Sequence, residues 1–300
     1  MIDITHKSNT LRKAIAQAMI SVSSAETIEA VKQKWVAKGD VFEMAKTAGL
    51  FAVKKTSDVI PDCHPMPIEF TAVRFEINGL EIRVEVEVHA IYKTGVEVEA
   101  MHAASVVALT VYDMLKPIDK NIEIKSIKLI EKKGGKSDYA NKTNATLRAA
   151  VIVCSDAVSK GKKEDNAGKV VVEKLKKMGF SISDYKIIPD EADQMQHHVK
   201  SYCDAKCDII IITGGTGLSK RDVTPETLNP LFDREIPGIA EAIRSYGQQR
   251  TPYSMLSRGV AGMIGDTLVL ALPGSTKGAE ESMDAVFPSI LHIFKVKEGK

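Results

Sequence analysis

The stretch CDIIIITGGTGLSKRDVTPE (207–226) decides the fold of the second half of the chain. Its first part, CDIIIIT (207–213), is short and β-branched, which is typical of a strand buried on both faces. The glycines that follow allow a tight turn and close approach of the backbone to a ligand. Thr224 and Pro225 then read as an N-cap and a first-turn proline, so a helix is expected to begin there. A strand, a glycine loop and a helix start present backbone N–H groups to an anion.

Other short apolar runs alternate with helical patterns around this stretch. The runs are AAVIVCS (149–155), YKIIP (185–189) and TLVLALPG (267–274), and AGKVVVEKLKKMGF (167–180) has helical spacing. Continuous apolar strands indicate a mostly parallel sheet covered on both faces, which predicts a three-layer α/β domain. Ligands of such domains bind at the carboxyl ends of the strands.

The first half of the chain follows a different pattern. Helices are predicted at TLRKAIAQAMI (10–20), SAETIEAVKQKW (24–35), DVFEMAKTAGLFAVKKT (40–56) and VEVEAMHAASVVALTVYDML (96–115). Alternation on both sides of Asn78-Gly79 predicts a hairpin over 68–92, and residues 121–133 alternate again. Helices on an antiparallel sheet make an α+β domain. The polar segment 131–148 places the boundary near residue 143, which gives domains 1–142 and 143–300.

Composition narrows the classes of function. Residues 1–145 carry 20 Lys and Arg against 19 Asp and Glu, and residues 146–300 carry 21 against 20, so neither half has the excess that nucleic-acid binding favours. The opening MIDITHKSNT is polar, and no run approaches the ~20 apolar residues of a membrane span. The four cysteines form no CxxC pair, which fits a reducing compartment. We therefore expect a cytoplasmic protein without nucleic-acid or membrane partners.

Polar and glycine residues follow each of the four predicted strands of the second half. In strand order they are Ser155 and Asp156, then Asp190, then Gly214, Gly215, Thr216, Gly217 and Asp222, and finally Gly274 and Ser275. Any one of them is more often a helix cap or a turn residue than a ligand. Because all four groups fall on one edge of one sheet, we interpret them as a single phosphate site. Carboxylates beside such a site suit Mg²⁺.

Three patterns in the first half carry reactive groups. Lys38 precedes a Gly-Asp helix start, where a positive charge is disfavoured. His64 lies in a stiff turn between prolines, and Asp113 and Lys116 share one helix face. A His-Pro turn is more often structural, and such an ion pair is more often simply solvated. Spacing alone leaves the reaction of this half open.

The second half resembles the MoaB and MogA family of molybdopterin-binding proteins over about 147–296. The resemblance rests on TGGTGLSKRDVTPE, on IIPDE before it, and on SRGVAG (257–262) and LPGS (272–275) after it. It implies a trimeric α/β protein that uses Mg-ATP to adenylylate molybdopterin. It also implies that Asp190 and Asp222 are catalytic and bind the metal, and that the glycine loop holds pterin and phosphates with Gly274 and Ser275 at its rim. A pterin-binding or oligomerising module without transferase activity is the alternative.

The first half resembles the MoaC family, the cyclic pyranopterin monophosphate synthases, over about 2–138. The motifs are KGDVFEMAKTAG, IPDCHP, KTGVEVEAM, AASVVALTVYDMLK and KKGGKS. They imply a ferredoxin-like fold, a hexamer with active sites at subunit interfaces, and rearrangement of 3′,8-cyclo-7,8-dihydro-GTP with release of pyrophosphate. The implied catalytic residues are Lys38, His64, Glu97, Asp113 and Lys116, with Glu99 and Lys136 binding substrate nearby. Val98 and Asp138 depart from the family's usual methionine and glycine. A nucleotide-binding scaffold is the alternative.

Both resemblances imply small-molecule pterin and nucleotide substrates, with Mg²⁺ and ATP needed in the second half. Trimers and hexamers share a threefold axis, so one homo-oligomer could satisfy both domains. The sequence thus predicts a bifunctional enzyme of molybdenum cofactor biosynthesis.

Overall fold

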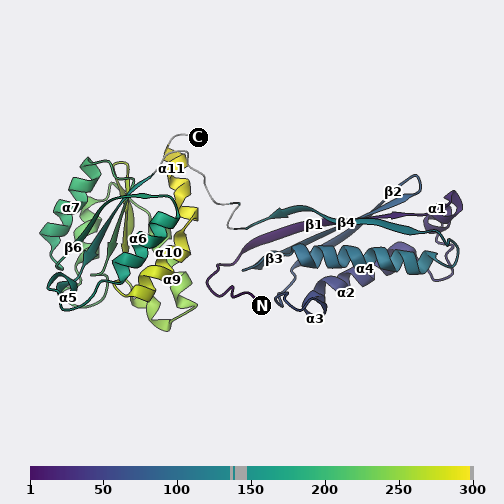
Figure 1. The fold of residues 1–300 in the computed structure, drawn as a ribbon, viewed down its shortest axis with the longest axis horizontal. Coiled ribbons are helices and arrows are strands. Elements are labelled where there is room, and N and C mark those ends of the chain that lie inside the picture. The colour runs from purple at the N-terminus through teal and green to yellow at the C-terminus, as the bar shows by residue number, and fades with distance from the viewer. Residues whose placement is uncertain (136–137, 139–146, 298–300) are drawn as a thin grey trace. The chain divides into compact units, whose positions relative to one another are not determined.

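The computed structural model describes residues 1–135, 138 and 147–297 of the 300-residue chain. The chain divides into two compact units, Met1–Tyr139 and Ala140–Lys300, which are called unit 1 and unit 2 below (Figure 1). The boundary predicted near residue 143 lies outside the described residues, so its position stays a prediction.

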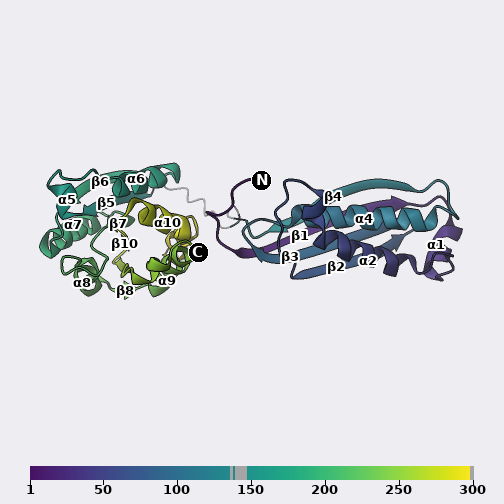
Figure 2. The same cartoon turned by 90° about the horizontal axis from the view of Figure 1, so that it is seen from below.

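Unit 1 is an antiparallel sheet with helices on one face, as predicted. Its elements are β1 (Thr10–Ser21), α1 (Ala25–Lys32), α2 (Val41–Lys54), α3 (Thr56–Val59), β2 (Phe70–Asn78), β3 (Glu81–Tyr92), α4 (Glu97–Leu115) and β4 (Glu123–Lys133). The strand order is β2-β3-β1-β4, and every neighbouring pair is antiparallel. Figures 1 and 2 show α2 and α4 side by side along the sheet. The predicted hairpin over 68–92 is β2 and β3.

Residues 10–20 form a central strand, so the helix predicted there is wrong. The apolar residues of this segment fit a helical spacing, and alanine favours helices wherever neighbours do not decide. In the folded chain β1 pairs with β3 along its whole length and with β4 on its other side. Its side chains alternate, and Ala14, Ala16 and Ala18 are fully buried beneath the helices. Pairing on both edges therefore overrides the local preference for a helix.

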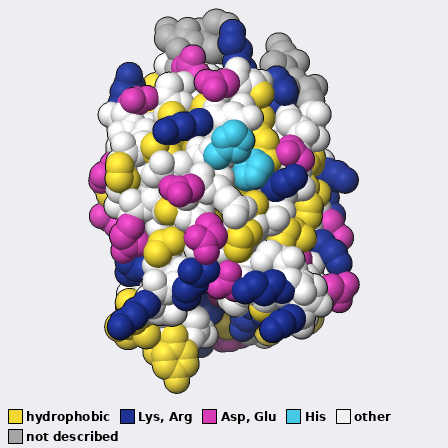
Figure 3. All heavy atoms as spheres, turned by 90° about the vertical axis from the view of Figure 1, so that its left-hand side faces the viewer, with side chains coloured by type: hydrophobic (Ala, Val, Ile, Leu, Met, Phe, Trp, Pro, Cys, Tyr) yellow, Lys and Arg dark blue, Asp and Glu magenta, His cyan; other side chains and the backbone are white. Residues whose placement is uncertain are grey.

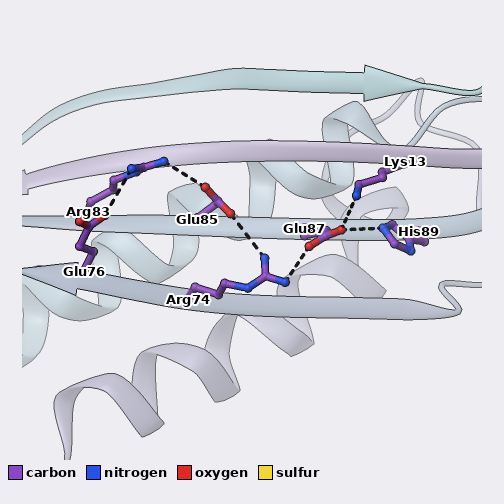
Figure 4. Close-up of polar contacts among 7 residues, drawn as sticks. All are labelled: Lys13, Arg74, Glu76, Arg83, Glu85, Glu87 and His89. Atoms are coloured by element: carbon purple, nitrogen blue, oxygen red, sulfur yellow. Dashed lines mark hydrogen bonds and ion pairs between the residues drawn. The ribbon is translucent and has the colours of Figure 1, made fainter.

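The face of this sheet away from the helices carries a network of charges, which Figure 4 shows. At its centre Glu87 accepts from Lys13 at 2.8 Å, from Arg74 at 2.8 Å and from His89 at 2.9 Å. Its side chain is only 10% exposed. The hydrogen bond from Lys13, supported by Arg74 and His89, lowers the pKa of Glu87 to about 2.

Helix α4 is the described helix that is long and apolar enough to cross a membrane. Half of its most apolar window is buried inside unit 1. Its buried residues include Ala100, Ala104 and Val107, which belong to the core against the sheet. The core helix of a compact domain has the same composition, so the finding is weak evidence for a membrane span.

Unit 2 is an α/β domain with a mostly parallel sheet, as predicted. Its main elements are β5 (Arg148–Cys154), α5 (Asp156–Ser159), α6 (Ala167–Lys177), β6 (Ser181–Ile188), α7 (Ala192–Asp204), β7 (Ile209–Thr213), α8 (Thr224–Leu228), β8 (Arg234–Glu235), α9 (Pro237–Gln248), β9 (Ala261–Ile264), β10 (Thr267–Leu272), α10 (Thr276–Val286) and α11 (His292–Lys297). Short 3₁₀ turns include η2 (Asn229–Leu231), η3 (Pro252–Leu256) and η4 (Ser289–Leu291). The strand order is β6-β5-β7-β10-β9-β8, parallel from β6 to β10 and antiparallel beyond it.

Helices cover both faces of this sheet. On β5 the side chain of Val151 packs in one core with residues of α6 and α10, whereas its neighbour Ile152 packs in a second core with residues of α7. Successive side chains of a strand point to opposite faces, so a strand buried on both faces is apolar throughout. The three-layer arrangement follows from these two cores.

Candidate functional site

The carboxyl ends of β5, β6, β7 and β10 surround a cavity of about 690 Å³ in unit 2. Most of the residues predicted for this half line it, namely Ser155, Asp190, Gly214, Gly215, Thr216, Gly217, Asp222, Gly274 and Ser275. The predicted residue Asp156 does not line it, because its carboxylate pairs with Arg221. Residues from four separate stretches of the sequence therefore come together at one edge of the sheet.

The glycine loop passes too close to β5 for any side chain at Gly214. This residue has a φ of +101°, and a Cβ there would lie 2.0 Å from the carbonyl oxygen of Cys154. The Gly214 carbonyl accepts the Thr224 hydroxyl at 2.9 Å. Helix α8 begins at Thr224 with Val223 in the N-cap position, one residue earlier than predicted. Thr224 thus uses its hydroxyl to hold the loop rather than to cap the helix.

Two buried polar atoms at the edge of the cavity lack a hydrogen-bond partner among the described residues. They are Asp190 Oδ1 and Thr213 Oγ1. The other oxygen of Asp190 accepts the backbone N–H of Asp156 at 3.0 Å. Burial raises the pKa of Asp190, and the nearby carboxylates of Asp156 and Asp222 add to the rise. An orphaned oxygen in a cavity indicates a ligand that would satisfy it.

These residues fit a magnesium ion that a substrate helps to bind. Asp222 Oδ2 accepts the backbone N–H of Ser219 at 2.7 Å, and the residue lines the cavity with Asp190. Within the described ranges no group of three or more His, Cys, Asp or Glu side chains could hold a metal. Mg²⁺ usually takes one or two protein carboxylates and completes its shell with water and phosphate oxygens.

Ser155 and Ser275 have structural roles in addition to lining the cavity. Ser155 Oγ accepts the Val158 N–H at 3.3 Å and caps α5, and Ser275 Oγ accepts the Gly278 N–H at 3.2 Å and caps α10. The interpretation of these serines as helix caps is therefore confirmed, and their role in substrate binding stays a prediction. Their position at the cavity follows from where the helices begin.

The sequence did not point to several residues of this site. Arg258 donates from Nε to the Gly217 carbonyl at 2.7 Å and from Nη2 to the Asp222 carbonyl at 2.7 Å, so it supports the glycine loop from outside. It stands in the quoted motif SRGVAG, which was the one available signal. Further lining residues come from η3 and α10, including Tyr253, Ser254, Glu281 and Ser282. No local pattern relates these segments to the glycine loop.

In unit 1, Lys38, Asp113 and Lys116 form one cluster at the carboxyl end of α4. Lys38 Nζ and Lys116 Nζ each lie 2.7 Å from an oxygen of Asp113. Hydrogen bonds from Lys116 and Lys38 lower the pKa of Asp113 to about 2. Asp40 caps α2 by accepting the N–H groups of its first turn. We expected the helix start to disfavour the charge of Lys38, but the ammonium group pairs with Asp113 instead.

A second cluster lies at the amino end of α4. Glu99 is 2% exposed, its Oε1 accepts the Cys63 thiol at 3.3 Å, and its Oε2 has no partner among the described residues. Burial raises the pKa of Glu99, and burial also raises the pKa of Cys63 to about 11. His64 Nε2 contacts the Ile2 carbonyl at 2.8 Å, and Glu97 lies 3.5 Å from Lys132 Nζ.

One copy of the chain does not bring these two clusters together. Glu97 and Asp113 are the first-turn and last-turn residues of the same helix, which at a rise of about 1.5 Å per residue places them about 24 Å apart along its axis. The five predicted catalytic residues of unit 1 are therefore split between two ends of α4.

The turn after β4 contains Asp138, which stands where the MoaC family usually has a glycine. Asp138 Oδ2 accepts the N–H groups of Gly134 at 2.7 Å and Gly135 at 3.1 Å, so the aspartate holds the glycine turn in place. Lys136, predicted to bind substrate, lies outside the described residues.

The chain is similar to known proteins along its whole length. The MoaC family model matches residues 1–135, and the model described as a probable molybdopterin binding domain matches residues 150–292. A molybdenum cofactor biosynthesis bifunctional protein from Chlorobaculum tepidum is 40% identical over 299 residues, which are 100% of this chain and 95% of that protein. A protein of the same name from Synechococcus elongatus is 34% identical over 312 residues, covering 100% of this chain and 98% of that one.

Each half also matches separate proteins. The cyclic pyranopterin monophosphate synthase of Clostridium perfringens strain SM101 is 45% identical over 143 residues, which are 47% of this chain and 90% of that enzyme. The crystal structure of the molybdopterin biosynthesis enzyme MoaB from Thermus thermophilus is 40% identical, covers 52% of this chain and 98% of its own, and has a TM-score of 0.49.

Proposed function

The chain belongs to the molybdenum cofactor biosynthesis bifunctional proteins, and on that premise we propose that its two units catalyse two different steps. Unit 1 converts 3′,8-cyclo-7,8-dihydro-GTP to cyclic pyranopterin monophosphate and releases pyrophosphate. Unit 2 transfers AMP from ATP to molybdopterin. Sulfur is inserted into the pterin between these steps, so the fusion does not pass a product directly from one site to the other.

The orphaned Asp190 Oδ1 beside the glycine loop is the observation that carries the proposal for unit 2. Asp190 and Asp222 would hold Mg²⁺, which when bound offsets the negative charge of the ATP phosphates. The backbone of Gly214–Gly217 would hold a phosphate. A phosphate oxygen of molybdopterin bonds to the α-phosphorus of ATP, the bond from that phosphorus to the bridging oxygen breaks, and its electron pair leaves with pyrophosphate.

An adenylylation assay on the whole chain tests this proposal. With Mg-ATP and molybdopterin the wild-type chain should accumulate adenylylated pterin, and Asp190→Asn or Asp222→Asn should lower the rate by about a hundredfold or more. Asp204→Asn, at the exposed end of α7, is the matched control and should keep full activity. Saturable pterin binding without any adenylylated product would instead identify unit 2 as a binding module.

For unit 1, the split between the two ends of α4 supports active sites shared between copies of the chain. The chain order β-α-β-β-α-β and the strand order β4-β1-β3-β2 support the ferredoxin-like fold. We place Lys38, Asp113 and Lys116 of one copy opposite Glu97 and Glu99 of another. A homo-oligomer with a threefold axis, either a trimer or a hexamer, is compatible with the assemblies that the two family resemblances imply for unit 1 and unit 2.

The two clusters supply different parts of the rearrangement. The two lysines that flank Asp113 bring two positive charges to one point, where they can offset the charge of the departing pyrophosphate. Glu99 is a buried carboxyl group, and its Oε2 has no hydrogen-bond partner among the residues that the structure describes. Burial also raises its pKa, so it is suited to carry a proton to or from a ring atom. Glu97 lies two residues before Glu99 on α4, and His64 follows Cys63, whose thiol contacts Glu99; both would orient the substrate.

Mixing two inactive variants tests the shared site. Lys116→Ala and Glu97→Gln should each abolish pyrophosphate release, whereas Lys120→Ala, an exposed lysine near the same helix end, should not. Because a mixed pair contains one site with both residues intact, co-refolded variants should recover roughly a quarter of the wild-type sites. Activity that stays at the level of the separate variants would contradict sharing between copies.

We also place the protein in the cytoplasm. Cys63, Cys154, Cys203 and Cys207 are all free thiols in the structure. Unpaired cysteines suit a reducing compartment.

A further inference from the structure

Arg221 lies at the mouth of the unit 2 cavity, where two acidic side chains hold it. Its Nε and Nη2 each lie 3.0 Å from an oxygen of Asp156 in a bidentate pair, and Nη2 also lies 3.1 Å from Glu191 Oε1. The side chain of Arg221 is 54% exposed and that of Glu191 is 51% exposed. Neither of them lines the cavity. The guanidinium group therefore stands beside the site without entering it.

The partners of Arg221 are neighbours of the predicted catalytic carboxylates. Asp156 donates its backbone N–H to Asp190, and Glu191 follows Asp190 in sequence. Arg221 itself precedes Asp222. A change of rotamer in this long, half-exposed side chain would release the guanidinium from these partners and let it turn toward the cavity.

Five acidic residues, Glu164, Asp165, Asp190, Asp222 and Glu281, line the cavity, and several lysines lie near them. Exposed Lys160, Lys162 and Lys163 follow α5, and exposed Lys220 precedes Arg221. On the face shown in Figure 3, basic side chains gather toward the lower edge, the edge at which α5 lies in Figure 1. Among these cations, Arg221 has the planar fork that binds carboxylates and phosphates in the same bidentate way.

We propose that Arg221 is a mobile phosphate-binding arm, which Asp156 and Glu191 hold at the mouth until Mg-ATP binds and which then moves to the β- and γ-phosphates. This inference rests on the proposed use of ATP by unit 2, and it adds the side chain that binds the pyrophosphate portion of the nucleotide. The carboxylates and the phosphates compete for one guanidinium group. The arm contacts the phosphates that leave and not the phosphate that is transferred.

Because the carboxylates and the phosphates compete for Arg221, the effect of Glu191→Gln on triphosphate binding distinguishes two roles of the arginine. It is either a mobile arm or a structural tie, an ion pair that holds the mouth of the cavity in shape. If Glu191 only helps to restrain the arm, Glu191→Gln frees Arg221 and strengthens binding of a triphosphate. If Arg221 instead holds the mouth in shape, losing either partner weakens binding. Both side chains are about half exposed, so neither variant should impair folding.

Calorimetric titration of the whole chain in Mg²⁺ with α,β-methylene-ATP and with AMP tests the arm without catalytic turnover. Arg221→Gln should weaken binding of α,β-methylene-ATP by about 10- to 100-fold, the value of a lost charge-assisted contact, and change AMP binding by less than about twofold. Glu191→Gln should tighten binding of the triphosphate analogue by about two- to tenfold. Lys220→Gln removes the same charge from the next residue and should cost less than about threefold.

Three results would overturn the inference. Equal affinity of wild type and Arg221→Gln for the triphosphate analogue would show that Arg221 does not bind these phosphates. Weakening by Glu191→Gln as large as that by Arg221→Gln would identify a structural tie. In both cases the proposed adenylylation would stand. Failure of the wild-type chain to bind the analogue would overturn the ATP proposal and the arm together.

Discussion

An Asp190→Asn substitution should stabilise unit 2 at pH 8 while it removes adenylyl transfer. Asp190 Oδ1 is buried without a partner among the described residues, and burial raises the pKa of the group. A carboxyl group whose pKa rises on folding contributes stability that is complete below its unfolded pKa and is lost as the pH rises through the folded pKa. At pH 8 the ionised Asp190 therefore opposes folding. Asparagine removes the charge and can still accept the N–H of Asp156.

The size of the effect follows from the orphaned oxygen. A buried polar atom without a partner costs about 1–3 kcal/mol, and the amide that replaces it keeps part of this cost. We therefore expect a gain of about 1 kcal/mol at pH 8, which for a unit of this size raises the melting temperature by about 2–4 °C. As the pH falls through the raised pKa of Asp190, the wild-type carboxyl group takes up its proton, so the gain should shrink toward zero.

Scanning calorimetry of the whole chain at pH 8 and pH 4 measures this difference. The single tryptophan, Trp35, lies in unit 1, so its fluorescence identifies the transition that belongs to that unit. Asp222→Asn is the matched control, because Asp222 Oδ2 already accepts the Ser219 N–H and no orphaned oxygen is relieved. A lower melting temperature in Asp190→Asn at pH 8, or the same gain at both pH values, would refute the reasoning.

Three further perturbations test other parts of the structure. Gly214→Ala should destabilise unit 2 by about 3 kcal/mol or more in denaturant titration, because its Cβ would meet a backbone carbonyl, whereas Gly161→Ala, at a φ of +68° in open space, should cost only about 1 kcal/mol. Cys63→Ala removes a donor that favours ionised Glu99, so the acidic limb of the unit 1 pH–rate profile should move to higher pH; an unmoved limb would exclude this contact from catalysis. Glu87→Gln should lower the melting temperature of unit 1 at pH 7. That loss should disappear as the pH falls toward 2, because the lowered pKa of Glu87 contributes stability only where the carboxylate is ionised, and a loss that persists at pH 2 would point to packing instead.

Short-range sequence preferences were sufficient to predict many helices and strands and part of the site. The hairpin at Asn78-Gly79, the helices after Ser24 and Asp40, and the strand at 209–213 follow from short-range turn, capping and burial preferences, and all of them form as predicted. Parallel strands place their carboxyl ends on one edge, which is why Asp190, Asp222 and the glycine loop could be predicted to meet.

The features that could not be predicted depend on contacts between residues distant in sequence. Residues 10–20 carry a helical pattern, but two neighbouring strands pair with them, and no property of the segment itself records those neighbours. The contacts of Arg258 with the glycine loop and of Arg221 with Asp156 join residues 30 or more positions apart. The sequence by itself thus determined the elements and the chemistry available to each, because propensity and capping act over a few residues. Only the tertiary structure decided which charges meet, because electrostatic and packing energies depend on distance in space.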